Sequence, residues 1–276
     1  MPINTERLES YIGKIDESLG KTQISSRLSS ATDLHFMPSL IQMVNTKKKG
    51  INAHFANDPN EFVEIVNNLI ENQILNAKII VNLEFSRIHF IAFDVCIKEG
   101  NISLIGLESA TLVSLGASML AFQCHVLLSK IPKLVLAIIE MDLQRSNGEC
   151  GIFSLAMIKT MHKEQKQMEI LHERNIKKDL PITMGIIIPI DNANKLLPPS
   201  FMKHSQSMRR LKRYLKAYDG AEHTVINKKG ETLLVRQQRF FGQIQVNEKT
   251  ISQSYSIETK RQKEMVNLLH FAAEYD

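Results

Sequence analysis

The chain is organised around residues 141–153, which read M-D-L-Q-R-S-N-G-E-C-G-I-F. The run that leads into this stretch, Lys133–Met141, is apolar and rich in strand-forming residues, as in a buried strand. Residues 146–148, Ser-Asn-Gly, are typical of turns and helix N-caps, and apolar residues recur at helical spacing after Cys150. The pattern therefore predicts a strand, a turn and a helix that carries Cys150 in its first turn.

Cys150 has two interpretations. In the first turn of a helix, unpaired backbone N–H groups and the positive end of the helix dipole stabilise a thiolate, which favours a nucleophile. A cysteine beside Ile152 and Phe153 can also be a buried core thiol, which is the commoner case for a lone cysteine. The cysteine alone does not separate the two.

Three other polar residues are placed to assist a nucleophile. Gln144 lies across the turn from Cys150, where its side-chain amide can donate to the oxyanion of a tetrahedral intermediate. His89 lies on an alternating strand, and Glu108 ends the strand that follows it in the sequence. A histidine and a carboxylate at the same end of neighbouring strands can form a base and its orienting partner. Each residue taken singly also has a structural interpretation, and only their combination favours catalysis.

The composition is that of a folded protein without disulfide or metal frameworks. The 276 residues are 43% hydrophobic, which is enough for a sizeable core. Three cysteines without metal-ligand spacing favour a reducing compartment. The sequence has no apolar run as long as a membrane helix, and its polar start is not that of a secretory signal peptide. We therefore expect a soluble protein that needs no metal.

Positive charge is modest overall but concentrated toward the C-terminus. The formal net charge is +5 and the pI is about 9.0. Such a cluster can bind a polyanion, or it can be a solvated helix face. A single aromatic residue, Tyr214, interrupts the main basic run, which argues against nucleic acid as the ligand. The basic residues cluster in Lys203–Lys216 and at Lys228, Lys229, Arg236 and Arg239.

The remaining elements predict helices packed on a small mixed sheet. Apolar spacing and caps predict helices over Thr5–Leu19, Asp33–Lys47, the residues after an Asp58 cap, Ser114–Leu128, Cys150 to about His172, Ser200–Tyr218 and Ile257–Ala273. Strands are predicted over Ile51–Phe55, Lys78–Leu83, Arg87–Val95, Ile102–Leu107 and Lys133–Met141, with a small hairpin of Thr224–Asn227 and Glu231–Val235. Pro38 is expected in the first turn of its helix, Lys21–Ala31 in a loop, and a module boundary near Asn175–Pro199.

Several motifs resemble those of a known family. The order His89, Glu108, Gln144, Cys150 is similar to that of the cysteine proteases that process ubiquitin-like modifiers. More closely, the chain resembles the YopJ-type effectors, protease-fold acetyltransferases that bacterial pathogens and symbionts inject into host cells. The resemblance extends from about Leu8 to about Leu269. It rests on I-H-F, L-E-S-A, E-M-D-L-Q-R-S-x-x-E-C-G-I-F-S, H-E-x-N-I, K-H-S-Q and N-K-K-x-E-T.

The resemblance implies a fold of the α+β class. A cysteine-protease-like catalytic core, a small mixed sheet packed by helices, would occupy residues 31–175. A mostly helical regulatory lobe would be built from both chain ends, residues 1–30 and 176–276.

The resemblance also implies an activity. The protein would be a bacterial effector acetyltransferase that takes the acetyl group from acetyl-CoA and forms an acetyl-cysteine. It would pass the group to Ser, Thr or Lys side chains of host signalling proteins such as kinases. Inositol hexakisphosphate would be its activator. Effectors of this type leave the bacterium by type III secretion and act in the host cell cytoplasm.

Individual residues receive roles from the same resemblance. Cys150 would be the nucleophile, His89 the base, Glu108 its partner and Gln144 an oxyanion donor, which makes a Cys-His-Glu triad with one added donor. The family usually has proline after the acid, and Ser109 takes that place here, which would loosen the strand end that aims Glu108.

The resemblance also suggests a modified lysine and residues that bind the activator. Lys203 opens K-H-S-Q and matches a lysine that family members acetylate on themselves. Guanidinium and ammonium groups suit dense phosphate. The candidates to hold inositol hexakisphosphate are therefore Arg209, Arg210, Lys228, Lys229 and Arg236.

Two other functions fit parts of the sequence. A cysteine protease that cleaves ubiquitin or ubiquitin-like conjugates would use the same residues, because both reactions pass through a thioester and differ in the acceptor. A non-enzymatic polyanion-binding module would use the basic C-terminal part, but it leaves Gln144 and the cysteine turn unexplained.

Overall fold

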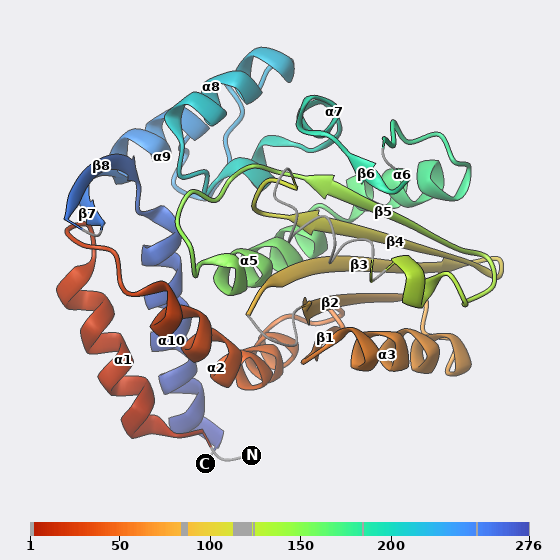
Figure 1. Cartoon of the computed structure of the whole chain (residues 1–276), viewed down its shortest axis with the longest axis horizontal. Helices are drawn as coiled ribbons and strands as arrows, with labels where there is room; N and C mark the ends of the chain where they lie inside the picture. Colours follow the sequence, from red (N-terminus) through yellow and green to blue (C-terminus); the bar gives the residue numbers. More distant parts are fainter. Residues whose placement is uncertain are drawn as a thin grey trace. The chain divides into compact units, whose positions relative to one another are not determined.

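The computed structural model describes residues 3–83, 88–112, 123, 125–183, 185–246 and 248–275. The chain divides into two compact units, each made of segments that are distant in the sequence (Figure 1). The end unit, named for the two chain ends that it holds, comprises Met1–Lys47, Leu143–Phe153 and Pro198–Asp276. The sheet unit comprises Lys48–Asp142 and Ser154–Leu197.

The sheet unit contains a six-stranded mixed sheet in the order β1-β2-β3-β4-β5-β6. β2, β3 and β4 are antiparallel neighbours, whereas β1, β5 and β6 each join the sheet through parallel pairing. The strands span Ala53–Ala56, Asn76–Asn82, Phe90–Lys98, Asn101–Glu108, Leu134–Glu140 and Ile187–Ile188. Together with the helices that pack on it, this sheet confirms the predicted α+β class.

The β3–β4 hairpin sets the positions of His89 and Glu108. Its turn lies at residues 99–101, as the sequence predicts, and the first two of these residues adopt positive φ. The register pairs Ala92 with Leu107. His89, just before β3, and Glu108, the last residue of β4, therefore lie at the same end of the sheet.

α3 (Pro59–Glu71) covers one face of the sheet and begins where the sequence predicts. The Asp58 side chain accepts hydrogen bonds from backbone N–H groups of the first turn, and proline follows at the first helical position. Phe62 of α3 stacks on Phe93 of β3, with 4.7 Å between the ring centroids. The apolar core on this face includes Val66, Leu69, Ile79, Val81, Leu104 and Ile138.

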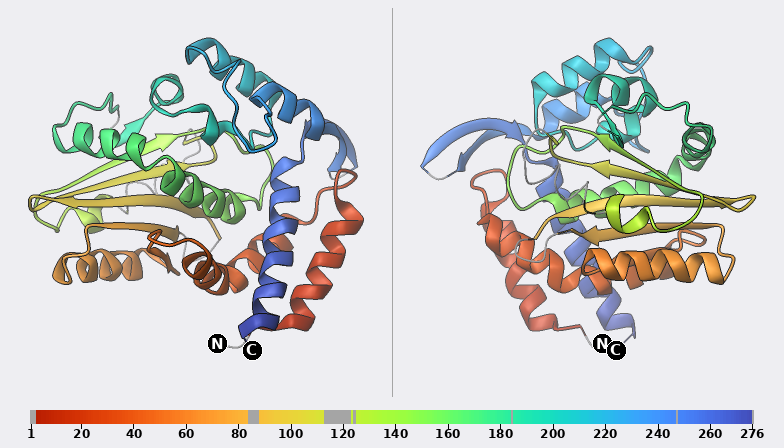
Figure 2. Two further views of the ribbon diagram at one scale, coloured as in Figure 1. Left: turned by 180° about the vertical axis from the view of Figure 1, so that it is seen from behind. Right: turned by 45° about the vertical axis from the view of Figure 1, so that its right-hand side comes forward.

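α6 (Gln165–Ile176) covers the opposite face, and Figure 2 shows α3 and α6 on opposite sides of the strands. Successive strand residues point to opposite faces, so Asp94 faces away from Phe93. His172 of α6 contacts this second face, with its Nδ1 2.8 Å from Ser103 Oγ and its Nε2 3.7 Å from the Asp94 carboxylate. The polar side chains of H-E-x-N-I are thus used to attach α6 to the sheet.

The prediction of a single helix from Cys150 to about His172 is wrong. α5 spans Cys150–Lys163, and α6 follows after a break at Glu164, whose φ of −97° and ψ of 34° leave the helical region. The new direction lets α6 bury apolar and polar side chains on the sheet, which periodicity along the sequence does not reveal. A short helix, α7 (Ile190–Leu196), follows β6.

The end unit is built mainly from helices of the two chain ends. α1 (Thr5–Ser18), α2 (Ser26–Lys47) and α10 (Ser256–Tyr275) pack together, α10 against both others, and the two termini lie at the same end of this bundle (Figures 1 and 2). α1 begins at an asparagine cap and buries Leu8 and Ile15, as its amphipathic spacing predicts.

α2 differs from the prediction at its start. It begins at Ser26, inside the range expected to be a loop, so Pro38 lies in the helix interior and not in the first turn. An interior proline costs the helix a hydrogen bond and about 3 kcal/mol. The burial of large side chains on both sides of Pro38 offsets this cost. Those buried side chains include Phe36, Met37, Leu40, Ile41 and Val44.

The prediction of one basic helix over Ser200–Tyr218 is also wrong in its extent. A 3-10 turn (Pro199–Met202) is followed by an irregular link and then by α8 (Met208–Ala217). The Ser207 side chain accepts from the backbone N–H of Arg210, and this cap determines where the helix begins.

The predicted hairpin of Thr224–Asn227 and Glu231–Val235 does not form. Thr232 instead caps α9 (Leu233–Phe240), and a two-stranded antiparallel sheet follows it, made of β7 (Phe241–Val246) and β8 (Lys249–Ser254). β8 is almost entirely polar, and β7 has only a short alternation in which Ile244 is buried, so the sequence signal for this hairpin is weak.

Some predictions fall outside the described residues. Cys124, Arg87 and most of the predicted helix Ser114–Leu128 are among them, and the described residues 125–128 are helical. Within the described part of the chain, every helix is too short or too polar to cross a membrane.

The two units differ in extent from the predicted functional division. α2 and residues 143–153 group with the chain ends, whereas residues 176–197 group with the sheet. Whether residues 31–175 act as a catalytic core and the rest as a regulatory lobe stays a prediction.

Candidate active site

His89 and Glu108 form a hydrogen-bonded pair in the sheet unit. His89 Nε2 lies 2.8 Å from Glu108 Oε2, and the Glu108 side chain is almost completely buried. The imidazole donates to the carboxylate in this arrangement, so the neutral ring carries its proton on Nε2 and its lone pair on Nδ1. The pair has the geometry of a base and its orienting acid.

Backbone contacts hold both members of the pair. The N–H of His89 donates to Asn82 Oδ1 at 3.0 Å, and its carbonyl accepts from the N–H of Leu83 at 2.8 Å. Glu108 uses its second oxygen, Oε1, to accept from the N–H of Ala110 at 2.8 Å. Serine in place of the family's proline at position 109 therefore leaves Glu108 aimed at His89.

Glu140 is a second buried carboxylate at this end of the sheet, which the sequence analysis missed. It is the Cα partner of Glu108 in the parallel β4–β5 register, and its Oε1 accepts from the N–H of Leu112 at 2.8 Å. It thus holds the segment that leaves β4 after the acid. The sequence does contain a signal for Glu140, because this residue opens the E-M-D-L-Q-R-S motif.

Cys150 opens α5 in the end unit, which confirms the predicted place of the cysteine in the first turn. Its side chain is buried, with 4% of the residue exposed. The carbonyl of Glu149 accepts from the N–H of Phe153 at 2.9 Å, and the Glu149 carboxylate is hydrogen-bonded to the Ser146 hydroxyl. Cys150 therefore sits at the N-terminal end of a regular helix, after a turn that is closed by side chains.

Gln144 lies in the same turn and is half-buried. Its Nε2 donates to the backbone carbonyl of Ser146 at 2.6 Å. One amide hydrogen thus supports the turn, and the oxyanion role of Gln144 stays a prediction.

Gln206, in the K-H-S-Q motif, is a second residue that the sequence analysis missed. Its backbone N–H donates to the carbonyl of Leu143 at 2.9 Å. Its Oε1 accepts from the backbone N–H groups of Arg145 and Ser146 at 2.6 and 3.1 Å. The motif was associated with Lys203 alone, although its glutamine holds the backbone of the turn that precedes Cys150.

The basic candidates differ in their environment. Arg209, Lys228 and Lys229 are exposed, whereas Arg210 is buried with 3% of its surface accessible. Of these, only the exposed side chains can meet a ligand without a change in the local packing.

Arg236 and Lys203 are brought together. Arg236 Nε donates to the carbonyl of Lys203 at 3.2 Å, and the guanidinium lies 4.8 Å from the centroid of the Phe240 ring. Burial lowers the pKa of Arg236. Arg239 stacks on the same ring from 4.5 Å and pairs with Glu231 at 2.6 Å, so this region also contains a carboxylate.

The site residues are thus divided between the two units. The sheet unit holds the His89–Glu108 pair, and the end unit holds the Cys150–Gln144 turn and the basic segment. Among the described cysteines, Cys96 and Cys150 are free thiols.

Comparison with known proteins identifies relatives along nearly the whole chain. A family model described as YopJ serine/threonine acetyltransferase matches residues 8–267. The serine/threonine-protein acetyltransferase YopJ of Yersinia pestis is 32% identical over 242 residues, which cover 85% of this chain and 82% of that protein. YopJ of Yersinia pseudotuberculosis matches with the same identity and coverage.

Solved structures agree with this result. An AvrA deletion variant with IP6 and CoA is 31% identical, with a TM-score of 0.86, and the match covers 97% of this chain and 99% of that one. HopZ1a in complex with IP6 and CoA has a TM-score of 0.77 with the same coverage, but at 18% identity it supports the fold alone.

Proposed function

Because the chain belongs to the YopJ family of serine/threonine acetyltransferases, we propose that it transfers acetyl from acetyl-CoA to serine, threonine or lysine side chains of host signalling proteins such as kinases. Cys150 is the nucleophile, His89 the base and Glu108 the orienting acid. The observation that carries this proposal is the 2.8 Å hydrogen bond between His89 and the buried Glu108, in a chain where Cys150 opens a helix and follows in the family's order.

The first half-reaction forms an acetyl-cysteine. The Nδ1 atom of His89 accepts the thiol proton as the sulfur of Cys150 attacks the thioester carbonyl of acetyl-CoA. The buried carboxylate of Glu108 stabilises the imidazolium ion that results. The tetrahedral intermediate then collapses, the bond to CoA sulfur breaks, and the CoA thiolate takes the proton from the imidazolium.

The second half-reaction transfers the acetyl group to the acceptor. Nδ1 of His89 removes a proton from the acceptor hydroxyl or amine, which attacks the acetyl-cysteine carbonyl. The cysteine sulfur leaves and recovers the proton. In both halves a negative charge develops on the carbonyl oxygen, and the Gln144 side-chain amide is the proposed donor that stabilises it.

We also propose that inositol hexakisphosphate binds the end unit and activates the enzyme. The AvrA structure with IP6 and CoA, at 31% identity, supports both ligands for this chain. Arg209, Lys228 and Lys229 offer exposed cations, and Arg236 joins them beside Lys203, the proposed site of self-acetylation. Arg210, a buried residue of α8, adds a further positive charge.

The family relationship supports delivery of the protein into host cells. We propose that it is secreted by a bacterium through a type III system and acts in the host cytoplasm. The two free thiols among the described cysteines suit a reducing compartment.

Intact-mass analysis after mixing with acetyl-CoA and inositol hexakisphosphate tests the enzyme mechanism. Wild-type protein should gain an acetyl group on Cys150 that hydroxylamine removes, and should then acetylate an acceptor protein. Cys150→Ala should do neither while keeping the wild-type melting temperature, because alanine removes the nucleophile with little change in volume.

Cys96→Ala is the matched control, because Cys96 is the other free thiol among the described residues. This variant should retain full activity. Acetyl transfer by Cys150→Ala would overturn the mechanism. Cleavage of a ubiquitin-like conjugate without acetyl transfer would favour the protease alternative.

A further inference from the structure

Arg261 of α10 is a fully buried arginine next to the cysteine turn. Its residue exposure is 1%, and it is the largest fully buried side chain among the described residues. Nε and Nη2 donate to the two carboxylate oxygens of Asp33 in α2, at 3.1 and 3.0 Å. This is a bidentate ion pair, the strongest form of side-chain hydrogen bonding between charged groups.

The same guanidinium also holds the backbone that precedes Cys150. Nη2 donates to the carbonyl of Gly148 at 2.7 Å, and Nη1 lies 3.7 Å from the Glu149 carboxylate. Gly148 has a φ of 102°, and a Cβ there would lie 2.8 Å from the backbone of Ser26, so only glycine fits this turn. Arg261 thus fixes the peptide that enters the cysteine's helix.

Asp33 holds the other side of Cys150. Its carboxylate accepts from the backbone N–H of Ile152 in the first turn of α5. A Cβ on Gly151 would lie 2.8 Å from Asp33 Oδ2, so glycine is required for this close approach. Asp33 therefore acts as an N-cap supplied by another helix, and Cys150 lies between two backbone groups that the ion pair holds.

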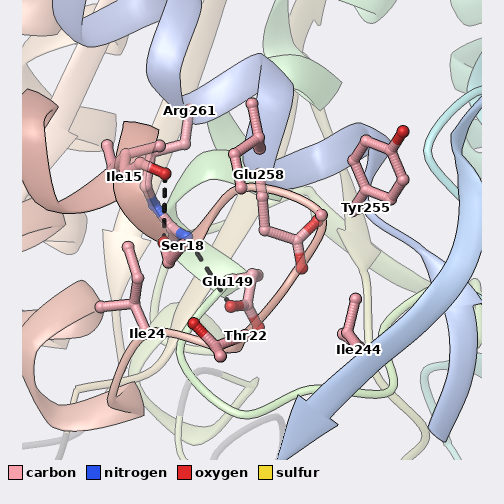
Figure 3. Close-up of a pocket in the computed structure, with 11 residues that line it drawn as sticks. Ile15, Ser18, Thr22, Ile24, Glu149, Ile244, Tyr255, Glu258 and Arg261 are labelled. Carbon is pink, nitrogen blue, oxygen red and sulfur yellow. Dashed lines mark hydrogen bonds and ion pairs between the residues drawn. The ribbon is translucent and has the colours of Figure 1, made fainter.

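Other ionisable groups surround the pair. Figure 3 shows Glu149, Glu258 and Arg261 lining one pocket of the end unit. Burial raises the pKa of Asp33, of Glu149, of Glu258 to about 8 and of Tyr11 to about 12. Burial opposes the charge of Arg261, but the adjacent Asp33 and other acidic neighbours outweigh it and raise the pKa of Arg261. The cavity holds only about 10 Å³, roughly one water molecule, so the cluster has no room for a ligand.

Stability alone does not account for this arrangement. A buried ion pair is often no more stabilising than apolar residues of the same volume, because both charges lose their hydration. What the pair does supply is a single orientation for the backbone on each side of Cys150.

We propose that Arg261 and Asp33 are positioning residues for the cysteine nucleophile. They orient the Cys150 thiol and the N–H groups at the start of α5, and they connect both chain ends to the reacting centre. The inference rests on the proposed role of Cys150 as nucleophile, but not on the identity of the acceptor.

Three variants test the proposal. Arg261→Lys keeps the charge but cannot reach both Asp33 oxygens and the Gly148 carbonyl at once. Asp33→Asn keeps an acceptor for Ile152 but removes the negative charge that neutralises Arg261. Lys78→Met is the matched control, because it breaks a similarly buried pair, Lys78–Asp94 at 2.7 Å, in the sheet unit.

We expect kcat per folded molecule to fall about 10- to 100-fold in Arg261→Lys, with KM for acetyl-CoA little changed, because misplacement of a reacting group by about 1 Å has an effect of this size. Lys78→Met should lose melting temperature but keep kcat. Wild-type kcat in folded Arg261→Lys, or an equal loss in Lys78→Met, would overturn the proposal.

The pH dependence of Cys150 alkylation by iodoacetamide gives a readout that is independent of acetyl transfer. In Asp33→Asn the pH profile should differ from that of the wild type, because a buried ionisable group next to the cysteine turn has been removed. An unchanged midpoint together with wild-type kcat would show a purely structural pair, even if Arg261→Lys fails to fold. Loss of the Cys150 mechanism would instead appear as acetyl transfer by Cys150→Ala.

Discussion

At the scale of single residues, Glu108 determines what His89 can do. The carboxylate engages Nε2, so the ring nitrogen able to accept a proton is Nδ1. Burial of Glu108 strengthens this hydrogen bond, because the local dielectric constant is low. Its second oxygen is held by Ala110, so the carboxylate cannot rotate away without losing a backbone partner.

This geometry predicts different losses in two variants. His89→Ala should lower kcat by about 10²- to 10⁴-fold, the usual contribution of a general base. Glu108→Gln should retain more activity, because the amide still bonds the ring but no longer stabilises the imidazolium ion. Single-turnover formation of acetyl-enzyme measures both, with Glu71→Gln, an exposed residue at the end of α3, as the control. Wild-type rates in Glu108→Gln would remove the acid from the mechanism.

At the scale of elements, α10 brings buried ionisable groups to the cysteine turn. Glu258 lies one turn before Arg261 and accepts from Gln206 Nε2 at 3.3 Å. Burial, with the neighbouring charge of Glu149, raises its pKa to about 8. At neutral pH the folded protein therefore keeps a proton on Glu258 that the unfolded chain has released.

The sign of the pH effect follows from this difference. Because folding raises the pKa of Glu258, this group contributes stability that is fully present below its pKa in the unfolded chain. That stability is lost as the pH rises toward 8, the pKa in the folded protein. In Glu258→Gln the side chain at this position is neutral at every pH. As the pH rises, the free energy of unfolding of the variant should therefore increase relative to that of the wild type, by at most about 1.4 kcal/mol per pH unit. Urea unfolding between pH 5 and pH 8.5 measures the effect, with Glu274→Gln at the exposed end of α10 as the control. A difference that is constant over this range would contradict the buried, protonated state.

Local signals explain which elements could be predicted from the sequence. α1 and α3 carry their caps and apolar stripes within a few residues, and the β3–β4 turn is marked by its glycine. α2 runs through Pro38 because tertiary burial outweighs a local penalty. The β7–β8 sheet was missed because β8 is almost entirely polar and β7 has only a short apolar alternation around Ile244.

The candidate site likewise contains residues that the sequence reveals and residues that only the fold brings together. His89, Glu108 and Cys150 each stand at an element boundary that the sequence reveals, so their order is readable. The ion pair of Asp33 and Arg261 joins positions 228 residues apart, and neither side chain has a local feature that points to the other. Gln206 likewise reaches the cysteine turn only through the fold.

At the scale of the whole molecule, exposed cations are concentrated in the end unit. α8 buries Leu211 and Tyr214 and presents a basic face to solvent, and the loop after it adds Lys228 and Lys229. Like charges at this density repel one another and weaken the compact state. A polyphosphate that binds only the ordered unit would remove this repulsion and stabilise it by mass action.

Inositol hexakisphosphate should therefore raise the melting temperature and increase acetyl transfer to Lys203 or to an acceptor protein. At about 100 times its Kd, a ligand stabilises the folded state by about 2.7 kcal/mol, a shift of several degrees for a chain of this size. Glutamate at both Lys228 and Lys229 should reduce the thermal shift and the activation together, while alkylation of Cys150 continues. Lys177→Glu with Lys178→Glu, an exposed pair in the sheet unit, is the matched control and should respond like wild type. Full activity of the wild type without the ligand, with a melting temperature that ignores it, would mean that the basic face is only solvated.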